Sequence, residues 1–177
     1  MTERAMTRRT LLAAGAATAG ALPGTAAAAG RPAGADGHAY EVVRTEAEWR
    51  AMLDEERYGI LRLGHTEWPR TSDLWEGTRD GTYRCRGCEL PVFEGRWQVP
   101  LDKGWVFFKH AVPNAVLTGI DGPVEQYGMA RTGGGPGALI EIHCRRCGSH
   151  LGHHLEVAGQ NLHCINGKAL ALTPVDA

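Results

Sequence analysis

The stretch "CRRCGSHLGHHLEV" at residues 144–157 begins with two cysteines three positions apart, and "CRGC" at residues 85–88 repeats that spacing upstream. Two cysteines so spaced in a tight turn direct both sulfurs at one ion, and two such turns complete a tetrahedral zinc site. Gly87 inside the first pair and Gly148 after the second suit the backbone of these turns. The pattern predicts a closed, structural zinc site with these ligands: Cys85, Cys88, Cys144 and Cys147.

The N-terminal segment has the order of an export signal. Arg8 and Arg9 precede an apolar run over residues 11–22, and alanines that suit a cleavage site follow at 26–29. The run is too short and too rich in Ala and Gly to span a bilayer stably. Paired arginines before "TLL" resemble a twin-arginine signal, which implies export of a folded protein. We expect a signal peptide at 1–29, a flexible linker at 30–39 and an exported domain, periplasmic or extracellular, at 40–177.

Disulfides or redox-active pairs are the alternative use of the four cysteines, because export places thiols where disulfides are common. Two redox pairs in one small domain without a βαβ pattern would be unusual. Zinc bound before export would also protect the thiols, and such a metal contributes directly to folding. We therefore favour zinc over disulfides.

Composition predicts one mainly β domain. The chain has 177 residues with 24 glycines and five tryptophans, and its net charge of −1 gives no electrostatic case for nucleic acid or an anionic membrane. A helix is expected over residues 45–61, with Thr45 as its N-cap, followed by a polar surface loop over 64–83. "RTGGGPGA" at 131–138 leads into an expected strand, so we interpret it as a hairpin connection and not as a phosphate loop.

From residue 83 onward the pattern changes to short apolar runs separated by turns, which is typical of β-strands. The expected strands lie at residues 82–84, 91–93, 105–109, 116–120, 124–131, 139–143, 153–157 and 162–166.

Cys164, in "LHCIN", has no cysteine partner once zinc takes the other four. It can be a buried, inert core residue or a reactive thiol, and its position in the sequence does not decide between them. On a strand, Asn166 shares the face of Cys164 and His163 faces the other side. A histidine that activates this thiol is therefore expected to be His150 or His153.

Five ordered blocks of the chain resemble the B-type peptide methionine sulfoxide reductases, the MsrB family. They are "GHTEWPRTSDLWEGTRDGTYRCRGCELPVF", "KGWVFF", "YGMART", "CRRCGSHLGH" and "HCIN", and the match runs from about residue 40 to residue 174. The resemblance implies a fold of two antiparallel sheets with a few peripheral N-terminal helices and a four-cysteine zinc site.

The resemblance also implies the roles of the site residues. Cys164 is the nucleophile that attacks the sulfoxide sulfur and becomes a sulfenic acid, and His150 or His153 is the acid that protonates the departing oxygen. Asn166 orients the substrate or a histidine. Trp105 and Phe108 are expected to bind the substrate, with Trp105 against its methyl group.

The sequence departs from the family's pattern beside the nucleophile. The family usually has an arginine two residues before the cysteine, where this chain has Leu162, and it often has Pro-Ser where residues 106–107 are Val-Phe. Loss of that cation should raise the pKa of the Cys164 thiol. His154 or Lys103 are the candidates for a substitute charge.

With no further cysteine to form a disulfide with Cys164, the expected reductant is an external thiol or a thioredoxin-like donor. The expected substrates are oxidised proteins or peptides that carry methionine-R-sulfoxide, which makes the protein a repair enzyme against oxidative stress. Two alternatives stay open: a divergent relative that reduces another sulfoxide or oxide, and a zinc-stabilised domain that only binds its ligand.

Overall fold

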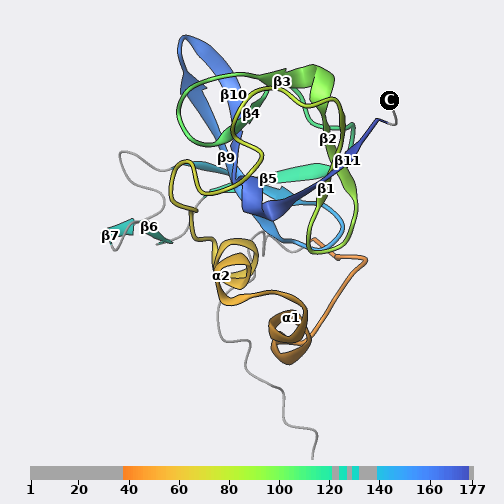
Figure 1. The fold of residues 1–177 in the computed structure, drawn as a ribbon. Helices are drawn as coiled ribbons and strands as arrows, with labels where there is room; N and C mark the ends of the chain where they lie inside the picture. Colours follow the sequence, from red (N-terminus) through yellow and green to blue (C-terminus); the bar gives the residue numbers. More distant parts are fainter. Residues whose placement is uncertain (1–37, 121–123, 127–128, 132–138, 176–177) are drawn as a thin grey trace, which may run out of the picture.

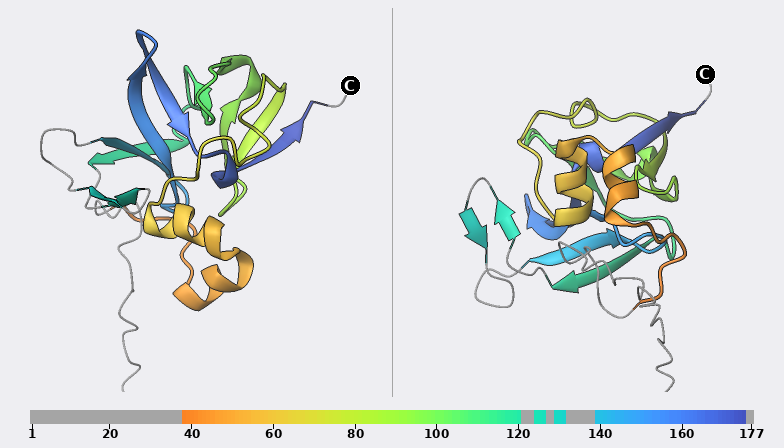
Figure 2. Two further views of the ribbon diagram at one scale, coloured as in Figure 1. Left: turned by 60° about the vertical axis from the view of Figure 1, so that its left-hand side comes forward. Right: turned by 90° about the horizontal axis from the view of Figure 1, so that it is seen from below.

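The computed structural model describes residues 38–120, 124–126, 129–131 and 139–175. The expected signal peptide and most of the expected linker lie outside the described residues. Two short helices precede the β-strands and lie together at one end of the sheets (Figures 1 and 2). Among the described residues, neither helix has the length and apolarity that a bilayer crossing requires.

The predicted helix over residues 45–61 is in fact two helices, α1 (Glu46–Met52) and α2 (Glu55–Leu63). Thr45 is the N-cap of α1, as predicted, and forms a capping box with Glu48. The continuous helix was a wrong expectation because Leu53 is extended and the Asp54 carboxylate accepts a hydrogen bond of 2.8 Å from the Arg57 amide. This cap begins a second helix at Glu55.

Two antiparallel sheets are the main secondary structure of the described chain, which confirms the predicted mainly β fold. The smaller sheet has the strand order β11-β1-β2 and the larger has the order β3-β4-β10-β9-β8-β5. The strands of the smaller sheet are β1 (Gly81–Cys85), β2 (Pro91–Glu94) and β11 (Leu170–Pro174). Those of the larger are β3 (Gln98–Val99), β4 (Val106–Phe108), β5 (Val116–Ile120), β8 (Ile140–Cys144), β9 (His150–Val157) and β10 (Gln160–Ile165).

The single strand predicted over residues 124–131 is instead a pair, β6 (Val124–Gln126) and β7 (Met129–Arg131), which form their own two-stranded antiparallel sheet. The predicted hairpin connection at 131–138 lies almost wholly outside the described residues. The sequence patterns did not predict β3 and β11, since a strand of two residues and one that ends in proline carry weak alternation.

An aromatic cluster fills the space between the two main sheets. Phe108 of β4 stacks on Phe93 of β2, with ring centroids 4.5 Å apart and an interplanar angle of 11°. Tyr83 of β1 meets Phe108 edge-on at 5.0 Å. Because all three side chains are fully buried, these contacts join the sheets through the most water-excluded part of the core. Helix α2 packs over β9 and the short 3-10 turn η2 (Gly167–Ala169).

Candidate functional site

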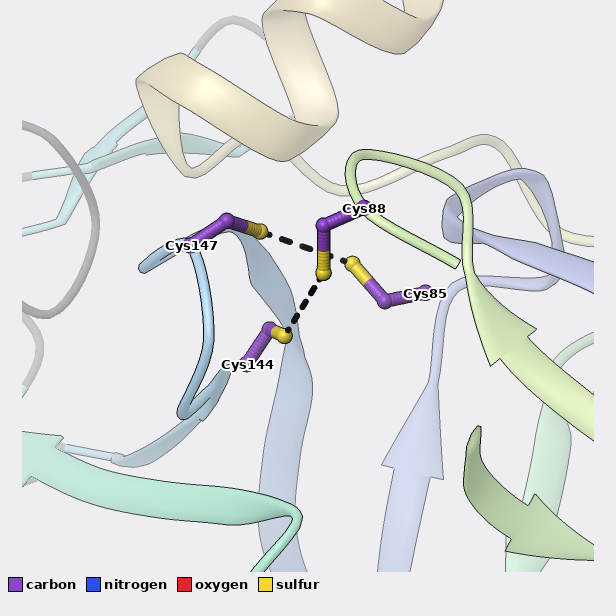
Figure 3. A group of neighbouring side chains, drawn as sticks. All are labelled: Cys85, Cys88, Cys144 and Cys147. Atoms are coloured by element: carbon purple, nitrogen blue, oxygen red, sulfur yellow. Dashed lines mark hydrogen bonds between the residues drawn. The ribbon is translucent and has the colours of Figure 1, made fainter. Parts of the chain in front are cut away.

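The four paired cysteines converge between the two sheets (Figure 3). Cys85 and Cys88 come from the turn between β1 and β2, and the other pair from the turn between β8 and β9. All four sulfurs lie within 4.8 Å of one another, with 3.7 Å from Cys85 to Cys147 and 3.5 Å from Cys88 to Cys144. Zn–S bonds of about 2.3 Å in a tetrahedron place sulfurs about 3.8 Å apart, so the set fits zinc.

Disulfides are not formed in the described structure, which includes all five cysteines of the chain and leaves each of them free. The alternative of two disulfides therefore has no support from the geometry. With four thiolate ligands, the metal would have no open position for water or substrate.

The two metal-binding turns share one backbone geometry. In each, the residue after the second cysteine is left-handed: Glu89 has a φ of 60° and Gly148 has a φ of 68°. The amide of each donates a hydrogen bond of 2.8 Å to the carbonyl of the first cysteine of its pair. The predicted backbone role of Gly148 is confirmed, since glycine adopts this conformation without steric cost.

Gly87 has a different reason to be glycine. A Cβ atom there would lie 2.7 Å from the Ser149 hydroxyl oxygen, which belongs to the other turn. Ser149 in turn lies 3.2 Å from the Cys147 sulfur, and the Arg62 guanidinium donates a hydrogen bond of 3.3 Å to the same hydroxyl. Gly87 therefore allows the two turns to approach closely, and Arg62 connects the second turn to α2.

Cys164 lies on β10, between β9 and β4. It is directly opposite His153 on β9 and Phe107 on β4. Residues directly opposite in an antiparallel pair have their side chains on one face, with Cβ atoms about 4.5–5.5 Å apart. His150, the other predicted histidine, has its ring 5.1 Å from that of His153. The structure thus brings the thiol and both histidines together. His153 is the direct neighbour of Cys164 across the sheet, and His150 contacts the ring of His153.

Asn166 connects three parts of the site by hydrogen bonds. Its amide nitrogen donates to the Leu151 carbonyl at 3.1 Å, and its amide oxygen accepts from the backbone N–H of Glu67 at 3.0 Å. The Glu67 carbonyl accepts a hydrogen bond of 3.3 Å from the Trp105 indole. Asn166 is 2% exposed, so its side chain does not face solvent. It holds the loop of Glu67, and the Glu67 carbonyl in turn binds the Trp105 indole.

Glu67 is a site residue that the sequence analysis missed. Its carboxylate accepts backbone hydrogen bonds from Gly167 at 2.7 Å and Lys168 at 2.8 Å, although the residue is 2% exposed. Burial raises its pKa, against the lowering effect of these two bonds. Its position in a long polar loop gave no signal of burial, because burial here depends on the fold of β10 and η2.

Phe108, which was expected to bind substrate, lies instead in the core cluster and has no exposed surface. It is opposite His163, on the face of β10 that points away from Cys164. Phe107 is the neighbour that shares the face of Cys164. This placement follows from strand alternation: in "VFF" two adjacent aromatic side chains face opposite ways, and only the register decides which one shares the face of Cys164. Trp105 is half-buried, just before β4.

The thiol of Cys164 lies in surroundings that oppose its ionisation. Burial raises its pKa to about 12, and the negative charge of Glu67 contributes to the increase. Leu162, where the resemblance implies an arginine, is an uncharged side chain with 1% exposure. His154 does not replace that cation, since it lies opposite His163 on the other face of the sheet, with the two rings 5.4 Å apart.

Comparison with known proteins gives the family. The SelR domain family matches residues 53–174. A peptide methionine sulfoxide reductase B3 of Arabidopsis thaliana is 33% identical over 138 residues, covering 75% of this chain and 71% of the relative. A peptide methionine sulfoxide reductase MsrB of Agrobacterium fabrum is 35% identical over 139 residues, covering 76% of this chain and 95% of the relative. The chain belongs to the SelR domain family, as the MsrB resemblance implied.

The close approach at Gly87 leads to a prediction about metal binding. Gly87→Ala should push the two turns apart, lower zinc affinity at least several-fold and cost about 1–3 kcal/mol of stability by overpacking. Adding Ser149→Ala removes the contacted oxygen and should restore most of both losses. Zinc release to a chromophoric chelator and thermal melting measure the two effects. Wild-type zinc retention in the single Gly87→Ala variant would contradict this account.

The absence of a cation at position 162 leads to a prediction about the thiol. Leu162→Arg should lower the pKa of Cys164 and, since the thiolate fraction at pH 8 rises, speed its alkylation by iodoacetamide about tenfold. Leu162→Met is the matched control, because it changes the packing of this buried position without adding charge. Equal alkylation rates in the two variants would show that the charge at this position does not reach the thiol.

Proposed function

We propose that this protein reduces peptide-bound methionine-R-sulfoxide to methionine, with Cys164 as the nucleophile. Membership of the SelR domain family supports methionine sulfoxide reduction in general, since the relatives named above are peptide methionine sulfoxide reductases. The observation that carries the proposal for this chain is the register of β9 and β10, which places the Cys164 thiol directly opposite His153.

The reaction transfers one oxygen atom and two electrons. The Cys164 thiolate attacks the sulfoxide sulfur, the S–O bond breaks, and the oxygen passes to the cysteine, which becomes a sulfenic acid. Methionine sulfur is reduced by two electrons and cysteine sulfur is oxidised by two. Protonation of the departing oxygen by His150 or His153 keeps charge from accumulating on it.

The high pKa of Cys164 gives His153 a further task. With a pKa of about 12, the thiol carries its proton near neutral pH, so attack requires a base within reach. His153, directly opposite, is the side chain placed to take that proton. The same proton can then pass to the sulfoxide oxygen, which makes the histidine first a base and then an acid.

Two thiols of an external donor complete the cycle. The first condenses with the sulfenic acid, releasing water and forming a mixed disulfide with Cys164, and the second displaces Cys164 as a free thiol. The four other cysteines lie together in the metal-binding set. We propose that they hold a structural zinc ion, which stabilises the fold without entering the reaction.

The proposal places this chemistry outside the cytoplasm, because residues 1–29 have the pattern of a twin-arginine signal. Its substrates there would be oxidised proteins of the envelope or secreted proteins. A second candidate function, reduction of a different sulfoxide or oxide, is favoured by Leu162 and by the high pKa of Cys164, which together distinguish this site from one with a cation beside its nucleophile. A binding domain without turnover is the third.

An epimer-resolved assay tests the function. The purified protein with dithiothreitol should consume the R epimer of a dabsylated methionine sulfoxide and leave the S epimer, since the shape of one site admits one configuration at the reacting sulfur. Cys164→Ser should abolish turnover while zinc content and melting temperature stay at their wild-type values. Consumption of neither epimer by folded, zinc-loaded protein would favour the second or third function, and loss of zinc from the serine variant would make Cys164 structural.

The fate of the oxidised cysteine is a separate prediction. After one turnover without a reductant, mass spectrometry should find Cys164 as a sulfenic acid that dimedone traps, with the four metal-binding cysteines unmodified. An intramolecular disulfide that includes Cys164 would contradict the proposal of an external donor.

A further inference from the structure

A buried carboxylate lies beside the two histidines of the site and has no role in the chemistry above. Glu141 of β8 is 6% exposed, and its Oε1 atom is 2.9 Å from Nδ1 of His150, which has no exposed surface. Its Oε2 atom lies 3.6 Å from Nδ1 of His143, beyond hydrogen-bond distance. The one hydrogen bond that this carboxylate forms to a histidine is therefore to His150.

The sheet register places Glu141 in line with the reacting thiol. Glu141 is directly opposite His153 on β9, and His153 is directly opposite Cys164 on β10. Side chains opposite one another in neighbouring antiparallel strands share a face of the sheet. One row across three adjacent strands thus carries a carboxylate, an imidazole and a thiol, and His150 is bonded to the first and in ring contact with the second.

The charge state of Glu141 fixes the direction of its hydrogen bond. Burial acts to raise its pKa, but the hydrogen bond from His150 and the nearby imidazoles of His143 and His150 outweigh burial, and the pKa is held well below its usual range. An ionised carboxylate has no proton to donate, so the bond at 2.9 Å runs from the Nδ1–H of His150 to Oε1 of Glu141. The His150 ring is then held in the tautomer that is protonated at Nδ1.

We propose that Glu141 is a positioning residue that orients His150 and fixes its tautomer, so that Nε2 is the ring nitrogen through which His150 exchanges a proton within the site. The inference rests on the proposed function for its catalytic consequence, but the tautomer itself does not depend on it. A carboxylate on one ring nitrogen both sets which nitrogen faces the chemistry and raises the basicity of the ring.

A purely structural role explains this arrangement less well. Burying a carboxylate is costly unless its charge is compensated, and well-packed apolar residues fill such sites without that cost. Glu141 is instead compensated by a histidine that touches the ring of His153, the residue opposite the nucleophile.

Three variants of the full chain separate positioning from packing. Glu141→Leu removes the acceptor, Glu141→Gln keeps an amide oxygen at the same reach without the charge, and His143→Leu removes the other histidine near the carboxylate while leaving the bond to His150. For each, long-range ¹H–¹⁵N spectra of the imidazoles report the His150 tautomer, and steady-state kinetics with methionine-R-sulfoxide report kcat and KM. Zinc content and melting temperature verify the fold.

Wild type and His143→Leu should show His150 protonated at Nδ1. Glu141→Leu should lose that signature and lower kcat about 10- to 100-fold, the size of effect known for carboxylates that orient metal-bound histidines, with KM within about twofold. Glu141→Gln should keep the tautomer and recover most of the lost kcat. If Glu141→Leu does not fold, the Glu141→Gln variant still tests the positioning role. A Glu141→Gln variant that keeps the wild-type His150 tautomer, yet has a kcat as low as that of a His150→Ala variant, would overturn that role.

An unchanged His150 tautomer in a folded Glu141→Leu variant would also overturn the inference. The failure of the proposed function is distinguishable from the failure of this inference. If the wild-type protein reduces no sulfoxide, but Glu141→Leu still changes the His150 tautomer, then the positioning role stands and only the reaction is wrong.

Discussion

The convergence of four cysteines between two turns is the constraint on which the rest of the structure depends. One turn closes the β1–β2 hairpin of the smaller sheet and the other joins β8 to β9 of the larger sheet, so a single ion would tie the two sheets together. β9 begins at His150, three residues after Cys147, and β10 then pairs along it. His150, His153 and Cys164 therefore take their positions from the two cysteine turns.

Two buried carboxylates lie near the site, and their surroundings shift their own pKa values in opposite directions. Glu67 accepts hydrogen bonds from backbone amides near Gly167, which offset only part of its burial, and its charge helps to raise the pKa of Cys164. Glu141 is compensated by two imidazoles, so its pKa falls although it is nearly as buried. The first carboxylate opposes ionisation of the Cys164 thiol, and the second accepts the hydrogen bond that orients His150.

Much of this arrangement could be predicted from sequence, because its strongest signals are local. Cysteine spacing predicted the metal-binding set, the capping sequence predicted the start of α1 at Thr45, and alternation predicted the central strands. The failures had local and long-range causes. The Asp54 cap is local, and it restarts a helix that periodicity alone continued. The register of β4 against β10 is long-range, and it places Phe107, not Phe108, on the face of Cys164. Glu67 and Glu141 carry no local sign of burial, since Glu67 meets Gly167 and Lys168 across the fold and Glu141 meets His150 only when β8 pairs with β9.

The high pKa of Cys164 has a consequence for the export proposed above. Oxidation of cysteine follows its thiolate fraction and its exposure, so a half-buried thiol with a pKa of about 12 reacts slowly with oxidants of its surroundings. The same property would make a poor nucleophile, unless a base removes the proton in the complex with substrate. In the proposed mechanism, His153 opposite the thiol, with His150 held by Glu141 beside it, supplies that base only within the assembled site. Slow reaction with oxidants and fast reaction with a bound sulfoxide are therefore compatible. Reaction with oxidants depends on the resting thiol, whereas reaction with the sulfoxide depends on a proton transfer between residues that the paired strands hold opposite one another.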